Sequence, residues 1–154
     1  MQELPHTRSC FVCGESNPLG LRLRFHTDGR IVHTEFTPRS EHIGFKAVVH
    51  GGLVATVLDE MMVWACAVPS KLFTFCAELT VRYHQPLRPG DPAVAQAELV
   101  SNRRNRIFEA KAEIRDSRGT LLASATGKYL PIQEKDFADL KADMINAPSG
   151  WTVD

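Results

Sequence analysis

Hydrophobic and polar residues alternate in several stretches of the chain, and one long stretch is almost wholly apolar. Alternation predicts strands at residues 21–25, 31–36, 73–83, 92–101, 106–115 and 120–130. The apolar stretch that follows His50-Gly51-Gly52 predicts a helix buried on most sides, which should stop near Val68 because Pro69 follows. A shorter amphipathic helix is predicted at 133–145.

Turn signals between these stretches give the order of the elements. Asp28-Gly29 predicts a tight hairpin, residues 38–49 a loop, and residues 102–105 and 116–119 short hairpin turns. The order is therefore two strands, one helix and four strands in a meander. We expect an α+β fold in which one long central helix is wrapped by an antiparallel sheet of about six strands.

Length and composition indicate one principal domain with short extensions. We expect an irregular N-terminal arm at 1–19, the main domain at 20–131, and a short helix with a loose tail from Asn146 at 132–154. The 18 basic and 18 acidic residues balance, so no attraction to nucleic acid or membranes is expected. With no charge-free transmembrane stretch and no signal-peptide pattern at the start, the prediction is a cytoplasmic protein with its four cysteines reduced.

Gly51, Gly52 and Asp59 carry the candidate chemistry. The first N–H groups of a helix lack intrahelical partners and carry the positive end of its dipole, so they can stabilise an oxygen that gains negative charge. Asp59 adds a carboxylate to an otherwise apolar helix. This combination points to acyl transfer.

The spacing of the two groups predicts a site shared by two chains. Asp59 lies eight residues after Gly51. On one helix that is roughly 12 Å, whereas a reacting carbon must lie about 3 Å from both groups. An isologous dimer would bring Asp59 of one subunit to Gly51 of the other, giving two sites per dimer.

Several segments resemble the hotdog-fold acyl-CoA thioesterases of the PaaI-like group. The similarity covers roughly residues 10–131 and rests on His-Gly-Gly with an acid nine positions after the His, together with Cys10-Phe11-Val12-Cys13-Gly14, Asn17-Pro18-Leu19-Gly20-Leu21, and residues 83–91. The resemblance implies a hotdog fold, Asp59 as nucleophile or general base, and the Gly51 N–H as the group that polarises the thioester carbonyl. It also implies a homodimer or a dimer of dimers, with acyl-CoA as substrate and the acyl chain along the helix interface.

Two positions depart from that family pattern. Gly44 stands where many relatives carry Asn or Gln, although His42-Ile43-Gly44 fits a subgroup with His-x-Gly, so His42 is a candidate to line the site. Cys76 stands where relatives often place a Ser or Thr that holds the attacking water. For His50 we favour an orienting hydrogen bond to the backbone over a role as general base.

Other polar residues admit two interpretations each. Glu60 competes with Asp59, but neighbouring helix residues point about 100° apart, so only one of them faces the site. Cys10-x-x-Cys13 is a lone pair; a turn that packs the arm is favoured over zinc or redox chemistry. The remaining candidates form an arginine cluster at Arg103, Arg104 and Arg106. This cluster is either a solvated turn or a binding site for the phosphates of CoA.

These considerations predict a thioester hydrolase that releases a free acid and CoA without a cofactor or metal. A hotdog-fold enoyl-CoA hydratase or dehydratase, in which His42 and Asp59 pair, is one alternative. A non-catalytic acyl-CoA binding module is the other, since Cys76 replaces the expected hydroxyl.

Overall fold

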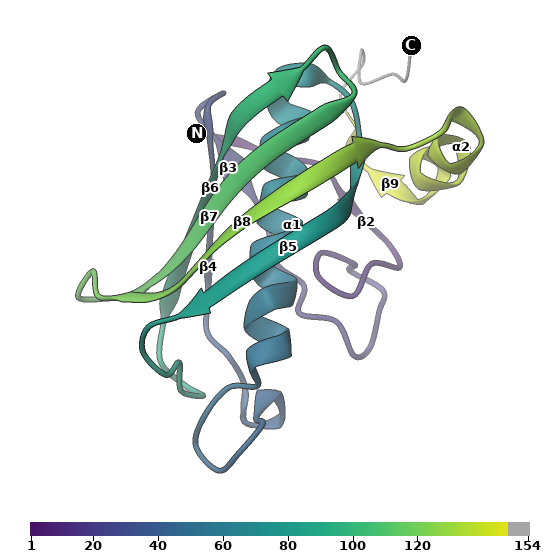
Figure 1. Cartoon of the computed structure of the whole chain (residues 1–154). Coiled ribbons are helices and arrows are strands. Elements are labelled where there is room, and N and C mark those ends of the chain that lie inside the picture. Colours follow the sequence, from purple (N-terminus) through teal and green to yellow (C-terminus); the bar gives the residue numbers. More distant parts are fainter. Residues whose placement is uncertain (148–154) are drawn as a thin grey trace.

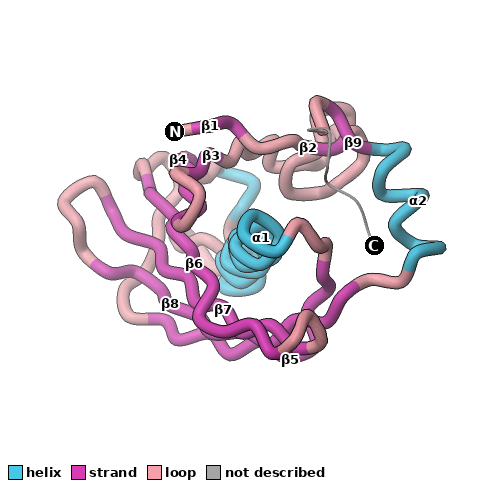
Figure 2. Tube along the Cα trace, turned by 90° about the horizontal axis from the view of Figure 1, so that it is seen from above, coloured by secondary structure: helices cyan, strands magenta, loops and turns pink. Residues whose placement is uncertain are grey.

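A single long helix, α1 (Gly51–Ser70), lies in the curve of an antiparallel sheet (Figures 1 and 2). The structure is a computed structural model and describes residues 1–147. The main sheet has seven strands in the order β1-β3-β4-β6-β7-β8-β5. Their bounds are β1 Gln2–Glu3, β3 His26–Thr27, β4 Ile31–Phe36, β5 Thr74–Tyr83, β6 Ala93–Arg103, β7 Ile107–Asp116 and β8 Leu121–Pro131. The predicted hotdog architecture is confirmed, with one strand more than expected.

The two ends of the described chain pack together on the side of α1 that the sheet leaves open (Figure 2). Strand β2 (His6–Thr7) pairs with β9 (Met144–Ile145), directly after helix α2 (Glu134–Asp143). Phe137 of α2 stacks on Phe73 with ring centroids 5.9 Å apart. The predicted amphipathic helix is thus present, and the arm contains short strands that its turn-rich composition did not indicate. The three domain boundaries stay predictions, and most of the predicted loose tail (148–154) lies outside the described residues.

The predicted four-strand meander is wrong in one respect. Strands β6, β7 and β8 do form a meander, but β5 pairs with β8 at the far edge of the sheet, and β6 pairs with β4. The reason lies in residues 84–92, which join β5 to β6. A tight hairpin uses a much shorter connection, so this segment instead crosses the end of the sheet. Alternation within a strand does not specify its neighbour.

The predicted strand at 21–25 is also wrong, because its backbone N–H groups bond to the arm, and its contact with the sheet is a side-chain bond from the Thr34 hydroxyl of β4 to the Arg24 carbonyl. Leu21 N–H donates to the Phe11 carbonyl at 2.8 Å and Leu23 N–H to the Val12 carbonyl at 2.9 Å. Arg22 between them has a left-handed φ of 55°, which breaks a regular strand. Sheet pairing begins only at β3, and the predicted Asp28-Gly29 hairpin then joins β3 to β4.

Helix α1 runs two residues beyond its predicted end. Pro69 lies in the last turn, where a missing N–H costs only one backbone hydrogen bond. The Ser70 hydroxyl donates to the Cys66 carbonyl at 2.6 Å, and Lys71 then ends the helix in a left-handed conformation. The helix has the length and apolar composition of a membrane span, but most of it is buried within the molecule, as a core helix of this fold requires.

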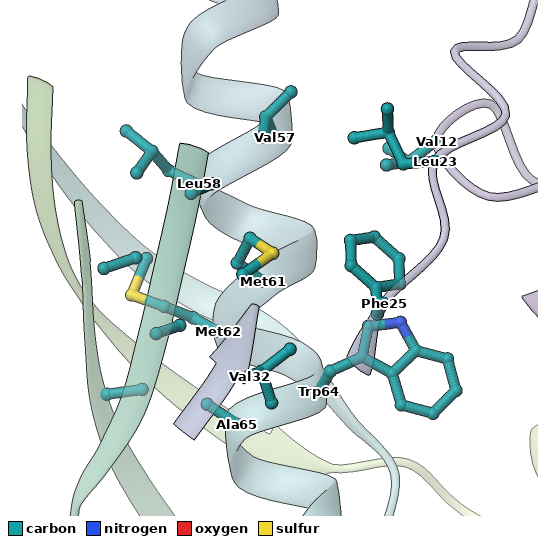
Figure 3. Packing of buried hydrophobic residues seen from close by; sticks show 14 of the residues in the cluster. Val12, Leu23, Phe25, Val32, Val57, Leu58, Met61, Met62, Trp64 and Ala65 are labelled. Carbon is teal, nitrogen blue, oxygen red and sulfur yellow. The ribbon is translucent and has the colours of Figure 1, made fainter. Parts of the chain in front are cut away.

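The core combines large side chains on α1 with a row of small ones on the strands that the helix packs against. Met61, Met62 and Trp64 of α1 are fully or almost fully buried, and Figure 3 shows them beside Phe25 and Val32. The inner face of the sheet carries buried alanines, which let the helix approach closely. They are Ala93, Ala95 and Ala97 on β6, Ala110 and Ala112 on β7, and Ala123 and Ala125 on β8.

Candidate active site

The start of α1 leaves one backbone donor available. His50 is the N-cap, and its Nδ1 accepts a hydrogen bond from the Gly52 N–H at 2.8 Å. The His50 carbonyl accepts from Leu53 and Val54. Among residues 1–147, the Gly51 N–H alone in this first turn has no hydrogen-bond partner. The backbone contact expected of His50 is therefore present, and it leaves Gly51 as the donor that could bind an oxyanion.

Gly44 and Tyr83 hold this helix start in place. A Cβ on Gly44 would lie 3.2 Å from the His50 Cα and ring, so a side chain there would crowd the capping residue. The Tyr83 hydroxyl donates to the Gly51 carbonyl at 2.6 Å. The close packing against His50 therefore explains why residue 44 is a glycine. The sequence comparison alone did not indicate this reason.

A largely apolar cleft of about 590 Å³ opens at this helix start. Gly44, His50 and Gly51 line it, together with the polar side chains of His84 and Gln85, and the rest of its lining is aliphatic or aromatic. Cavities of this size and character accommodate small molecules. The wall residues are Phe45, Val48, Val49, Val54, Tyr83, Pro86, Leu87, Ile114, Leu122 and Ala123.

Asp59 lies beside Tyr129 and Cys76. The Tyr129 hydroxyl donates to Asp59 Oδ1 at 2.8 Å, and its ring is fully buried. Burial and the adjacent Asp59 charge raise the pKa of Tyr129, so the phenol stays neutral and keeps its proton. Burial and Asp59 also raise the pKa of the Cys76 thiol. The structure thus brings together Asp59 and Cys76, two of the candidate site residues.

Tyr129 was missed by sequence reasoning, although a signal existed. A buried tyrosine needs a partner for its hydroxyl, and alternation along 120–130 points Tyr129 toward a helix whose only charges are Asp59 and Glu60. Gly127 makes room for it, since a Cβ there would lie 2.6 Å from the Tyr129 ring.

Glu60 faces away from this group, toward the N-terminal arm. Trp64 Nε1 donates to Glu60 Oε1 at 3.2 Å, and Cys10 and Cys13 are its other neighbours. Burial, with the nearby Cys10, raises the pKa of Glu60 to about 8. A hydrogen bond from Cys13 lowers the pKa of Cys10 to about 6. The two adjacent carboxylates therefore serve different sides of α1.

Gly51 and Asp59 lie at opposite ends of β5 within one chain. Gly51 contacts Tyr83, the last residue of β5, whereas Asp59 contacts Tyr129, which pairs with Cys76 near the start of β5. Seven extended residues span about 23 Å. The register of the sheet therefore agrees with the helix spacing: one chain does not bring the two groups to one carbon.

His42 lies outside the cleft at Gly51. Its Nδ1 accepts from the Arg39 N–H at 3.0 Å, and it lines a separate depression with Pro38, Arg39 and Leu53. Its backbone carbonyl accepts from the His50 N–H at 2.9 Å, so it supports the capping residue indirectly. The hydratase alternative requires a contact between His42 and Asp59. Within residues 1–147 of one chain, the structure shows no such contact.

The predicted arginine cluster forms the exposed tip of the β6–β7 hairpin. Arg103 pairs with Glu109 at 3.4 Å, while Arg104 and Arg106 have no ion-pair partner within residues 1–147. Arg104 and Asn105 adopt left-handed φ values that make the turn. The neighbouring row of the sheet, Asn102-Phe108-Tyr129-Cys76, places this tip at the Asp59 end of the molecule.

Comparison with known proteins identifies the class to which this fold and site belong. The family model of the thioesterase superfamily matches residues 46–123, from the loop before α1 into β8. The chain therefore belongs to the thioesterase superfamily, and the resemblance inferred from its motifs is confirmed.

Solved structures show the same fold. RHA08564, a thioesterase superfamily protein, is 28% identical with a TM-score of 0.73; the match covers 80% of this chain but only 63% of RHA08564. PaaI from the phenylacetic acid degradation operon of E. coli is 19% identical with a TM-score of 0.66, and the match covers 73% of this chain and 81% of PaaI. The smu.793 protein of Streptococcus mutans UA159, solved bound to acetyl-CoA, is 12% identical with a TM-score of 0.64. The match covers 71% of this chain and 88% of smu.793.

Proposed function

We propose that this protein is an acyl-CoA thioesterase that hydrolyses a thioester to a free acid and CoA at a site shared by two subunits. The observation that carries the proposal is the unpartnered Gly51 N–H at the head of an apolar cleft, combined with Asp59 eight residues along the same helix. The CoA-bound members of the same fold support the substrate class.

The dimer follows from the free edge of the sheet. β5 is the last strand in the sheet order, and no described strand covers its outer edge. Exposed edge strands readily pair with another chain. Two copies of β5 paired antiparallel about Thr80, with Leu79 opposite Val81 of the partner on the same face, bring the Cys76 end of each strand beside Tyr83 of the other. Asp59 and Gly51, which contact these flanking residues, then approach one another across the interface.

The exposed face of α1 fits the same arrangement. Gly51, Ala55 and Asp59 recur every four residues and are half-exposed in one chain. Small residues at the first two positions let a second helix or a ligand approach closely. The two-fold axis then passes near Ala55 and creates two equivalent sites. A dimer of dimers would add copies of these sites without changing them.

In the proposed mechanism the thioester carbonyl oxygen accepts a hydrogen bond from the Gly51 N–H. Asp59 of the partner subunit either attacks the carbonyl carbon or removes a proton from a water that attacks it. The carbonyl electrons move onto oxygen, where the helix start stabilises them, and then return to expel the CoA thiolate, which takes up a proton. Where Asp59 itself attacks, water then hydrolyses the resulting mixed anhydride, which releases the free acid and restores the carboxylate. Tyr129 donates to Asp59 Oδ1 and so orients the carboxylate. No step requires a metal or cofactor.

The arginine tip offers a place for the phosphates of CoA. Arg104 and Arg106 are exposed and unpaired within the described chain, and they lie at the Asp59 end. Guanidinium groups bind phosphate bidentately. Replacing both with Ala should raise KM for acyl-CoA with less change in kcat. A short thioester that lacks the nucleotide should be unaffected, and equal losses on both substrates would contradict this assignment.

The direct test is thiol release from short, medium, long and aromatic acyl-CoAs. Asp59→Asn should lose several powers of ten in kcat, while the exposed carboxylate variant Asp139→Asn on α2 should match the wild type. Absence of thiol release across the panel, with tight acyl-CoA binding, would establish a binding module. Loss of enoyl-CoA absorbance without thiol release would establish a hydratase. A cytoplasmic location remains a prediction.

A further inference from the structure

Cys10 and Cys13 are held in a tight turn that places both thiols on one side. Gly14 N–H donates to the Cys10 carbonyl at 2.8 Å, and Val12 N–H donates to Cys10 Sγ at 3.2 Å. A Cβ on Gly14 would lie 2.2 Å from the Cys10 carbonyl oxygen and 2.7 Å from its nitrogen, so only glycine fits. The sequence Cys-x-x-Cys-Gly therefore encodes a specific backbone geometry, and a simple packing turn would not demand it.

Helix α1 brings a third potential ligand to these thiols. Cys10 Sγ, Cys13 Sγ and a Glu60 carboxylate oxygen all lie within 4.8 Å of one another. In tetrahedral zinc sites, Zn–S bonds of about 2.3 Å and Zn–O bonds of about 2.1 Å place ligand atoms roughly 3.5–3.8 Å apart. Small side-chain adjustments therefore suffice to bring the three atoms onto one ion.

Neighbouring groups orient each of the three donors. Val12 N–H points at Cys10 Sγ, the Thr7 hydroxyl lies 3.6 Å from Cys13 Sγ, and Trp64 Nε1 donates to Glu60 Oε1. Cys13 also hydrogen-bonds to the Glu60 carboxyl group, so the carboxyl group already faces the thiols. Supporting contacts of this kind fix ligands and raise metal affinity.

We propose that Cys10, Cys13 and Glu60 bind one zinc ion, with water as the fourth ligand, and that this ion fixes the N-terminal arm to α1. Two sulfur ligands exclude magnesium and calcium, which prefer oxygen, and a mixed thiolate–carboxylate set suits zinc. The cation would also balance three acidic groups that otherwise meet at a largely buried position.

The alternative to a zinc site is a disulfide or redox pair formed by Cys10 and Cys13. The position of Glu60 distinguishes these two possibilities. A disulfide needs no carboxylate, and a carboxylate beside the thiols disfavours the thiolate through like charge. Zinc recruits all three groups. The proposal is independent of thioesterase activity, because Glu60 and Asp59 face different sides of α1.

The test measures zinc itself on the full chain. Protein purified with reductant is stripped with a chelator, titrated with Zn²⁺, and assayed for bound metal. Cd²⁺ titration in parallel reads the thiolate-to-metal charge-transfer band. The wild type should bind one equivalent with submicromolar Kd. The double variant Cys10→Ser/Cys13→Ser should bind none, and Glu60→Gln should bind at least about tenfold more weakly.

Two matched variants control for the loss of any thiol or any helix carboxylate. Cys66→Ala removes a buried cysteine elsewhere on α1, and Asp59→Asn removes the adjacent acid; both should keep wild-type Kd. Circular dichroism confirms that each variant is folded. Binding weaker than micromolar, unchanged affinity in Glu60→Gln, equal binding by the double cysteine variant, or recovery of a Cys10–Cys13 disulfide in place of metal would each overturn the proposal.

Discussion

The Gly51 N–H is the one proposed catalytic group that can be deleted without removing a side chain. Gly51 is the first residue of α1, the helix position where proline is best tolerated because its missing N–H has no intrahelical role. His50 has φ −58° and ψ 130°, which suits a residue that precedes proline. Gly51→Pro therefore removes the donor while the local backbone stays compatible with the fold.

The expected loss can be estimated from the role of a single oxyanion donor. Removing one such donor costs about 10²–10³ in kcat, or roughly 3–4 kcal/mol of transition-state stabilisation. The matched control is Gly51→Ala. Its Cβ meets the same Tyr83 ring atoms, 3.3 Å away, but the N–H remains. The kcat of the alanine variant measures the steric effect, and the ratio of the two variants isolates the hydrogen bond.

Steady-state thiol release with a saturating acyl-CoA measures kcat, and thermal unfolding checks that both variants stay folded. Gly51→Pro should be at least about a hundredfold slower than Gly51→Ala. If two folded variants differ by less than about threefold, the Gly51 N–H is not the oxyanion donor, and the reasoning from the helix start fails.

Three further predictions follow from the same geometry. Mixed dimers of inactive Asp59→Asn and Gly51→Pro chains should regain roughly a quarter of wild-type activity, because half are heterodimers with one intact site; verified heterodimers without activity would refute the shared site. Tyr129→Phe should lower kcat about tenfold with little change in KM, since it frees the Asp59 carboxylate it orients; a pure KM effect would contradict a positioning role. With chelator present, the wild type should lose stability relative to Glu60→Gln as pH rises from 5 to 8. Burial raises the pKa of Glu60 to about 8, so over this range the folded state holds a proton that the unfolded state has released. The limit is about 5 kcal/mol, measured by urea unfolding at each pH, and parallel curves would show that Glu60 is not perturbed.

The elements that were predictable from sequence are those whose signal is local. Alternation found β4 through β8 within a residue or two, because each has one buried face. The Gly-Gly start and Asp59 marked both halves of the proposed site, because a carboxylate on an apolar helix needs a specific reason to be there.

The misses concern interactions between segments distant in sequence. Residues 21–25 alternate like a strand, but their hydrogen bonds go to the arm. The place of β5 beside β8 depends on how the chain crosses the end of the sheet, which no local pattern records. Tyr129 escaped attention because its partner, Asp59, is 70 residues away. The meeting of Glu60 with the two arm cysteines is equally non-local.

The buried alanines beneath α1 set how far the helix stands from the sheet. Gly51 and Asp59 both belong to that helix, so a larger residue at Ala95 or Ala112 would lift both at once, and in a dimer would displace both halves of two sites. A shift of about 1 Å in reacting groups can cost a hundredfold in rate. If the proposed function holds, these alanines are therefore positions where small changes in side-chain volume would alter the rate through the placement of the helix, without changing any residue of the proposed site.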